Sequence, residues 1–91
     1  MLRLLCRNRV EDFARWKAIF SAHEAEHAAA GMKLVEVCRS VEDPNNIFFW
    51  FEIASMDRAL TYISNVEAAN VGAAAGVIDG TYHFLDAAGG Y

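Results

Sequence analysis

The fold of this chain is decided by the stretch FARWKAIFSAHEAEH, which occupies residues 13–27. Five ring-bearing side chains recur in it at spacings of three and four, namely Phe13, Trp16, Phe20, His23 and His27. These spacings place all five on one face of an α-helix. Because the first three are apolar, this face is predicted to pack on a sheet, and the two histidines then point toward the same core.

The end of this stretch also matches a metal-site pattern. Residues 23–27 spell His-Glu-Ala-Glu-His, which is the zinc-protease pattern H-E-x-x-H. Catalytic zinc needs two histidines one turn apart, a third protein ligand and an open position for water. The remaining histidine is His83, and Glu24 lies toward the edge of the stripe. We therefore expect no metal and interpret the motif as a coincidence in a helix rich in alanine and glutamate.

Composition and charge limit the class of protein. The 91 residues are 55% hydrophobic and 22% charged, which indicates one globular domain over residues 1–91. The formal net charge is −4, and no basic face suited to nucleic-acid phosphates is evident. The apolar runs are too short to span a membrane, and the charged start does not resemble a signal peptide. Cys6 and Cys38 are expected to be free thiols, which predicts a cytoplasmic protein.

The order of the predicted elements defines the fold class. Strands are expected at residues 2–7, 32–41, 47–53 and 77–85. A first helix is expected over residues 10–30 with Asn8 as its cap, and a second begins after Ser55 and breaks at Ser64-Asn65. Gly31 and Gly76 are the predicted helix ends. This order predicts an α+β, ferredoxin-like βαββαβ sandwich with an antiparallel sheet.

The strand predicted at residues 47–53 is apolar on both faces, with Phe49 and Phe51 on one and Phe48, Trp50 and Glu52 on the other. Two helices cover only one face of such a sheet. The second face therefore needs another cover, and we infer that two sheets meet in a homodimer.

Three segments match the pattern of a known family. They are Val10-x-Asp12-Phe13-x-x-Trp16-Lys17-x-x-Phe20-x-x-His23 with Ala30-Gly31, then Glu42-Asp43-Pro44-Asn45 before a strand ending Phe51-Glu52, and finally Ala75-Gly76-Val77. Over nearly its whole length the chain thereby resembles the small dimeric α/β-barrel proteins related to antibiotic-biosynthesis monooxygenases. The resemblance implies a ferredoxin-like domain that pairs as a dimeric α/β barrel.

The resemblance also implies a ligand cavity between sheet and helices, or within the barrel. The superfamily includes cofactor-free monooxygenases, polyketide cyclases and haem-degrading enzymes, so the fold alone assigns no activity. We expect a small-molecule-binding protein that acts, without a cofactor, as a monooxygenase or cyclase on an aromatic or polyketide-like substrate. The alternatives are a non-catalytic ligand-binding or sensing module of the same fold, and a haem-binding or haem-degrading protein.

Candidate site residues come from the helix stripe and the strands. His23, which matches a first-helix histidine of the family, is the expected base or oxyanion partner. Further pocket residues are expected to be His27, Trp16, Phe20, Trp50, Glu52 and His83. Each also has a structural interpretation: the aromatic rings as core, Glu52 as an ion-pair partner of Arg3 or Arg7, and His83 as a residue of either sheet face.

Overall fold

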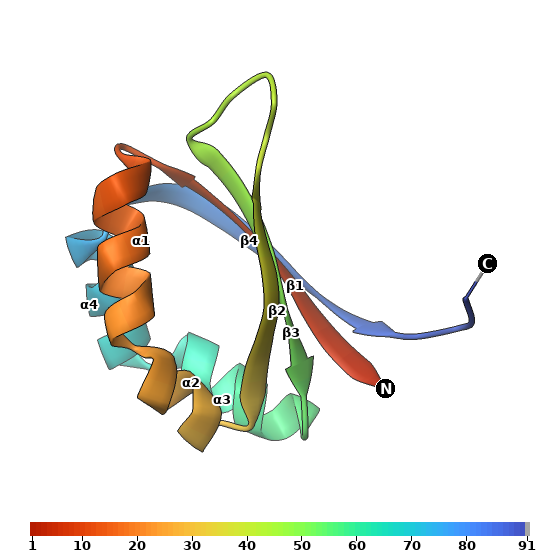
Figure 1. The fold of residues 1–91 in the computed structure, drawn as a ribbon. Coiled ribbons are helices and arrows are strands. Elements are labelled where there is room, and N and C mark those ends of the chain that lie inside the picture. The colour runs from red at the N-terminus through yellow and green to blue at the C-terminus, as the bar shows by residue number, and fades with distance from the viewer. Residues whose placement is uncertain (91) are drawn as a thin grey trace.

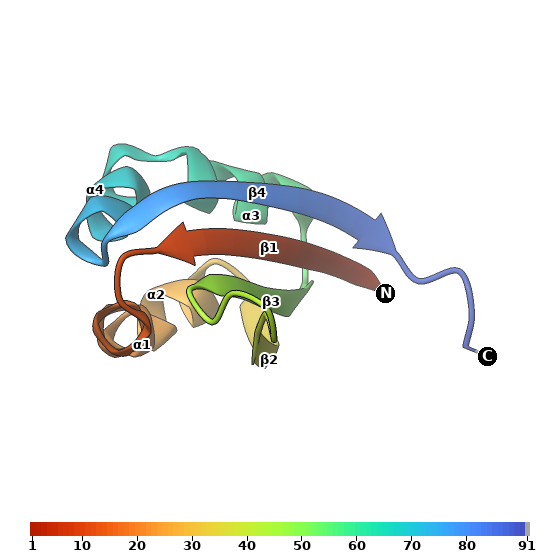
Figure 2. The same cartoon turned by 90° about the horizontal axis from the view of Figure 1, so that it is seen from above.

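The structure, a computed structural model, describes residues 1–90. Its elements are β1 (Leu2–Val10), α1 (Phe13–Ala22), α2 (Glu24–Ala29), β2 (Met32–Arg39), β3 (Asn46–Ile53), α3 (Met56–Ser64), α4 (Val66–Ala74) and β4 (Val77–Asp86). The strands form one antiparallel sheet in the spatial order β2-β3-β1-β4 (Figure 2). This topology confirms the predicted α+β, ferredoxin-like sandwich.

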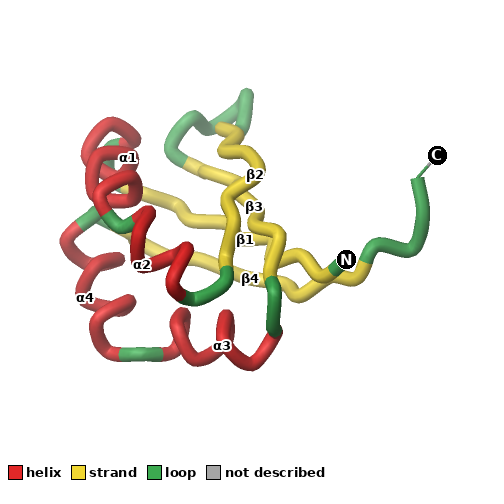
Figure 3. The backbone as a smooth tube through the Cα atoms, turned by 60° about the horizontal axis from the view of Figure 1, so that its bottom comes forward, coloured by secondary structure: helices red, strands yellow, loops and turns green. Residues whose placement is uncertain are grey.

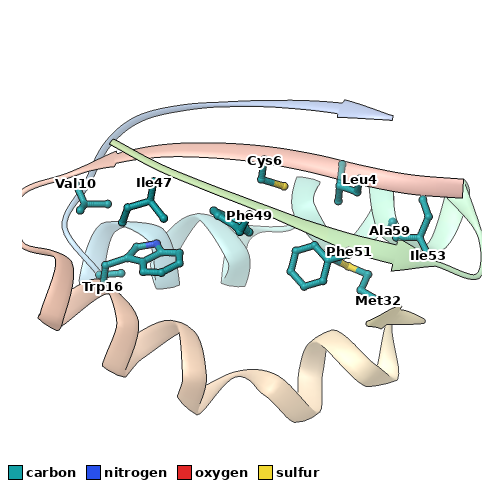
Figure 4. Close-up of a cluster of buried hydrophobic side chains, with 11 residues drawn as sticks. Leu4, Cys6, Val10, Trp16, Met32, Ile47, Phe49, Phe51, Ile53 and Ala59 are labelled. Atoms are coloured by element: carbon teal, nitrogen blue, oxygen red, sulfur yellow. The ribbon is translucent and has the colours of Figure 1, made fainter. Parts of the chain in front are cut away.

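The helices all lie against one face of the sheet, and the opposite face is bare (Figure 1). Strand alternation sorts the side chains of β3 between the two faces. Its helix-facing residues, which are buried, are Ile47, Phe49, Phe51 and Ile53. With Leu4, Trp16 and Met32 they form the core between the two layers (Figure 4). The half-buried residues between them, which include Trp50 and Glu52, point to the bare face.

The first helical segment differs from the prediction at its start and in its continuity. β1 continues to Val10, because Asn8 pairs with β3 on one side and with β4 on the other. Asn8 is therefore not a helix cap, since two hydrogen-bonded ladders outweigh a single capping bond. Asp12 caps α1 instead, and its carboxylate accepts a hydrogen bond of 3.0 Å from the Arg15 amide. The helix is interrupted at His23 (φ −105°, ψ 17°), which separates α1 from α2 (Figure 3).

The other helix boundaries agree with the sequence signals. Gly31 and Gly76 follow α2 and α4 with φ of +73° and +76°, the left-handed conformation that glycine adopts most easily. Ser55 caps α3, and Asn65 caps α4 with a 2.7 Å hydrogen bond from the Ala68 amide. The expected break at Ser64-Asn65 is thus confirmed.

The spacing of Ala59, Leu60, Ile63 and Val66 predicts one apolar side for the second helical segment, and Val66 is an exception to it. Its side chain is 75% exposed, so the expectation that it joins the buried face was wrong. The reason is that α4 begins at Val66 as a new helix, and the face defined by α3 does not extend across the break. Among the described residues, no helix has the length and apolar character needed to cross a membrane.

Candidate functional site

A cavity of about 220 Å³ lies between the helices and the covered face of the sheet. Its floor is formed by strand residues whose side chains alternate toward the helices, among them Cys6 and Asn8 of β1 and Phe49 and Phe51 of β3. Tyr82 of β4 also lines it and is 50% exposed, so this part of the wall meets solvent. The cavity therefore occupies the region between sheet and helices that the family resemblance implied.

An aromatic series along α1 and α2 forms the roof above this floor. The ring of Trp16 stacks on that of Phe20 with centroids 4.6 Å apart, and the centroids of the Phe20 and His27 rings are 4.9 Å apart. The ring centroids of Trp16 and Phe49 are 5.3 Å apart, and this contact joins the roof to the floor. The stripe predicted from residues 13–27 thus passes the helix break, and its last ring is an imidazole at the cavity wall.

The two histidines of the stripe have different surroundings. The Nδ1 atom of His23 lies 2.8 Å from the Ile19 carbonyl oxygen, and its ring, which is half-buried, does not line the cavity. His27 is 9% exposed. The centroid of its ring lies 5.3 Å from that of Phe51 and 5.4 Å from that of Tyr62. The break at His23 therefore leaves His27 as the imidazole that faces the cavity.

Burial and neighbouring charge set the protonation of the groups around His27. Burial lowers the pKa of His27, and the positive charge that His23 can carry lowers it further, against a smaller opposing effect of Glu26 and Glu24. Burial, with a contribution from Glu26, raises the pKa of Tyr62. At neutral pH the cavity therefore offers a neutral imidazole beside a protonated phenol, which together can accept and donate a proton.

A polar contact joins the floor of the cavity to its roof. With the Asn8 amide turned so that its oxygen faces the indole, this oxygen accepts a hydrogen bond of 3.2 Å from Trp16 Nε1. The amide nitrogen then donates to the Arg7 carbonyl at 3.0 Å. Both side chains line the cavity, so this contact fixes the orientation of the indole in its wall.

The thiol of Cys6 in the floor is not an activated nucleophile. Burial raises its pKa to about 12, so almost none of it is thiolate near neutral pH. It contributes an apolar surface to the cavity.

A second hollow lies on the other side of His27, between α1–α2 and the free edge of β2. It has a volume of about 580 Å³ and shares Phe20, His27 and Met32 with the cavity. Its lining also includes Glu24 and Lys33, which are exposed. The three shared side chains therefore form a partition between an apolar interior and a charged surface groove.

The remaining predicted site residues lie on the bare face of the sheet. Trp50 and His83 are both cross-strand neighbours of Leu5, so the three share one face, and Glu52 is on it two residues along β3. This places His83 on the bare face, a choice that the sequence left open. Of the predicted residues, the structure thus brings Trp16, Phe20 and His27 together at the cavity and holds Trp50, Glu52 and His83 apart from it.

Among the ion pairs of the described residues none involves Glu52, so the expected ion pair is not formed, although basic residues lie beside it. Arg3 is its direct cross-strand neighbour on β1, and Lys33 is its neighbour on β2. Arg7, the other expected partner, instead contacts Asp79, with Nη2 and Oδ1 2.7 Å apart. In residues 1–90, no group of three His, Cys, Asp or Glu side chains is arranged to hold a metal ion.

Sequence reasoning missed four polar side chains of the cavity, Asn8, Tyr62, Thr81 and Tyr82. Asn8 was interpreted as a helix cap, and the position of Tyr82 in the strand predicted at residues 77–85 favours a core residue over a site residue. Tyr62 carries a usable signal, because it follows the buried Ala59 by three residues and so shares its helix face.

Comparison with known proteins bears on the fold. No family model and no curated protein matches the chain. A solved structure assigned as an antibiotic biosynthesis monooxygenase from Bordetella bronchiseptica is similar, with a TM-score of 0.77, 13% identity and coverage of 94% of this chain and 95% of that one. A similarly assigned structure from Caulobacter crescentus CB15 has a TM-score of 0.73, 19% identity and coverage of 97% and 90%.

A third similar structure is a mutant of SnoaB, a cofactor-independent oxygenase from Streptomyces nogalater. Its TM-score is 0.74 at 14% identity, with 98% of this chain and 94% of that chain covered. At such low identities the likeness concerns the backbone. The chain therefore has the fold of the antibiotic-biosynthesis-monooxygenase-like proteins, as the resemblance in its sequence predicted.

Proposed function

We propose that this protein binds a small aromatic molecule in the cavity and oxidises it with O₂ in the absence of a cofactor. The observation that carries this proposal is the buried, neutral His27 imidazole at the wall of an aromatic cavity. A base of this kind can take a hydroxyl proton from a phenolic substrate. The fold of SnoaB, a cofactor-independent oxygenase, supports the same reaction class.

The reaction is illustrated by 1-naphthol, which we choose as a probe. The hydroxyl proton moves to His27, and the electron-rich ring forms a carbon–oxygen bond to O₂ at the position para to the hydroxyl. The proton on His27 returns to the peroxide, and loss of water leaves 1,4-naphthoquinone. One oxygen atom of O₂ enters the product, the other leaves as water, and the substrate supplies all four electrons.

Neighbouring side chains have supporting roles in this scheme. The Tyr62 hydroxyl, which is kept protonated by burial, can donate a hydrogen bond to the substrate oxygen. Trp16, Phe20 and Phe49 supply apolar walls that exclude water from the anion. His23, the base expected from the sequence, sits four residues away, and its ring is bonded to a backbone carbonyl.

The test compares two matched histidine variants. Oxygen uptake with 1-naphthol is followed with an electrode for the wild type, His27→Gln and His23→Gln. We expect His27→Gln to lower turnover by at least about 100-fold, the usual contribution of a general base, and His23→Gln to retain most of it. The reverse pattern would assign the base to His23. Binding of aromatic probes without any oxygen uptake would instead favour the non-catalytic ligand-binding module.

We further propose that the bare face of the sheet pairs with a second copy of the chain. Leu5, Phe48 and Trp50 on this face are half-buried in a single chain, and Leu85 beside them is 45% exposed. Apolar surface of this kind is typical of an interface. Sedimentation should find a dimer at micromolar concentration, and Trp50→Glu should convert it to a monomer. A monomeric wild type would contradict the pairing.

We place the protein in the cytoplasm on the strength of its cysteines. Cys6 and Cys38 are both free, which fits a reducing compartment.

A further inference from the structure

The volume of the cavity limits what it can hold. An apolar cavity of about 150 Å³ accommodates one benzene ring, and sites for drug-sized molecules start at about 300 Å³. The cavity here, with about 220 Å³, lies between these values. This is space for one substituted ring or for two fused rings, and three fused rings exceed it.

Two of the walls that set this volume, the floor formed by the sheet and the roof formed by α1, are rigid. Trp16, Phe49 and Phe51 are 2%, 5% and 1% exposed, and each is held by aromatic neighbours. Close-packed side chains of this kind yield little to an oversized ligand. The cavity therefore cannot expand toward α1 or into the sheet at low cost.

A further wall, formed by α4, is built from small residues. Ala68, Gly72 and Ala75 line the cavity on this side. A Cβ atom added at Gly72 would meet one atom within 4 Å, the Val77 Cγ2 at 3.9 Å, outside the glycine's own neighbours and helix backbone. A glycine inside a helix destabilises the helix relative to alanine. Helix formation therefore does not account for Gly72, whereas the space that it leaves in the cavity does.

The charge of the ligand is limited as well. Among the residues of the described chain that line the cavity there is no Asp, Glu, Lys or Arg. A carboxylate or phosphate bound there would be desolvated without a counter-charge, which is costly. Burial lowers the pKa of His27, so its imidazole supplies no fixed positive charge at neutral pH.

From the volume, the small-residue wall and the absence of charge, we propose that the cavity takes an uncharged hydroxylated aromatic molecule of one or two fused rings, and that Gly72 determines this size limit. The proposal rests on the proposed function for the identity of the site, and it adds the class of ligand and a specificity-determining residue. The ligand hydroxyl lies at the His27 and Tyr62 end, where the hydrogen-bonding groups of α2 and α3 face the cavity.

Equilibrium dialysis of the purified protein tests the ligand class with three probes. They are 2-naphthol, the three-ring 2-anthrol, and 2-naphthoate, which keeps two rings but carries a charge. We expect 2-naphthol to bind more than about tenfold tighter than either of the others. Equal or tighter binding of 2-anthrol would overturn the size limit and show that the partition of Phe20, His27 and Met32 opens. Tight binding of 2-naphthoate, or no binding of 2-naphthol, would overturn the ligand class.

Substitutions on α4 test the role of Gly72. Gly72→Leu should weaken 2-naphthol binding more than about tenfold, because its side chain fills the cavity. Gly72→Ala should raise the melting temperature and still weaken binding, which separates loss of space from loss of fold. Ala69→Leu, at an exposed position of the same helix, is the matched control and should leave binding unchanged. Unchanged affinity in Gly72→Leu would refute the assignment.

The outcomes separate this proposal from the proposed function. If the probes bind in the expected order but no oxygen is consumed, the oxidation proposal fails and the ligand class stands. If oxygen is consumed with the three-ring 1-anthrol as efficiently as with 1-naphthol, the size limit fails and the oxidation proposal stands.

Discussion

The substitution Trp16→Phe tests what holds α1 on the sheet. Trp16 is 2% exposed, and its ring stacks on Phe20 and contacts Phe49. Phenylalanine keeps one aromatic ring at this position. It leaves empty the space of the outer six-membered part of the indole and removes the Nε1 donor, whose acceptor is the Asn8 side-chain oxygen at 3.2 Å.

The expected loss has two parts. A residual void of ~40 Å³ costs about 1 kcal/mol, at about 24 cal/mol per Å³ of cavity. Loss of the hydrogen bond to Asn8 costs about 1 kcal/mol more, because the amide oxygen is left without its donor. We therefore expect the free energy of unfolding to fall by about 2 kcal/mol, which corresponds to a drop in melting temperature of roughly 8–16 °C for a domain of this size.

Urea unfolding followed by far-ultraviolet circular dichroism measures this loss, at one protein concentration for all variants. The variants are Trp16→Phe, Asn8→Ala and the double substitution, which together give the coupling energy of the pair, expected to be about 1 kcal/mol. Val66→Ala, at a 75% exposed position of α4, is the control and should change stability by less than about 0.5 kcal/mol. A loss below about 0.5 kcal/mol for Trp16→Phe, or a coupling energy near zero, would refute the reasoning.

Three further predictions follow from burial and backbone geometry. Burial lowers the pKa of His27, so the unfolded chain takes up the proton more readily, and stability should fall as the pH drops below the ordinary histidine value of 6.5. His27→Gln should flatten this dependence in urea titrations at several pH values, and an unchanged slope would exclude His27 as its source. Gly31→Ala should cost about 1–2 kcal/mol, because φ is +73° and the new Cβ would lie 3.2 Å from the Ala54 Cβ. Gly90→Ala, with nothing within 4 Å, should be neutral in the same assay. Cys6, with its pKa raised to about 12, should react with iodoacetamide far more slowly than an unfolded-chain thiol, and rapid labelling of the native protein at Cys6 would contradict its burial.

Local sequence signals predicted several of the helix boundaries, because the residue that starts or ends a helix lies within a few positions of the turn that it affects. The Ser55 cap, the helix break at Ser64-Asn65 and the glycine at position 31 act on the adjacent turn, and each was found where the sequence indicated. Asn8 carries the same kind of signal as Ser55, yet it lies in β1. There, partners from β3 and β4, far away in the chain, supply hydrogen bonds that a single-sequence pattern does not reveal.

The candidate site shows the same division between local and long-range causes. The spacing of Trp16, Phe20 and His27 identified three of the side chains that meet at the cavity. The same spacing treated His23 and His27 alike, because both belong to one stripe. The two histidines have different surroundings because the helix is interrupted at His23. The residues of the stripe carry no sequence signal for that interruption.

Residue order alone was sufficient for the sequence of elements, the two unlike faces of β3 and the inward direction of the aromatic stripe. These properties are periodic along the chain and are therefore readable from neighbours. The packing of the elements decided which imidazole faces the cavity, which residues share the bare sheet face, and how much space remains beside Gly72. These outcomes depend on contacts between α1–α2, α4 and the sheet, and such contacts exist only once segments distant in sequence have come together.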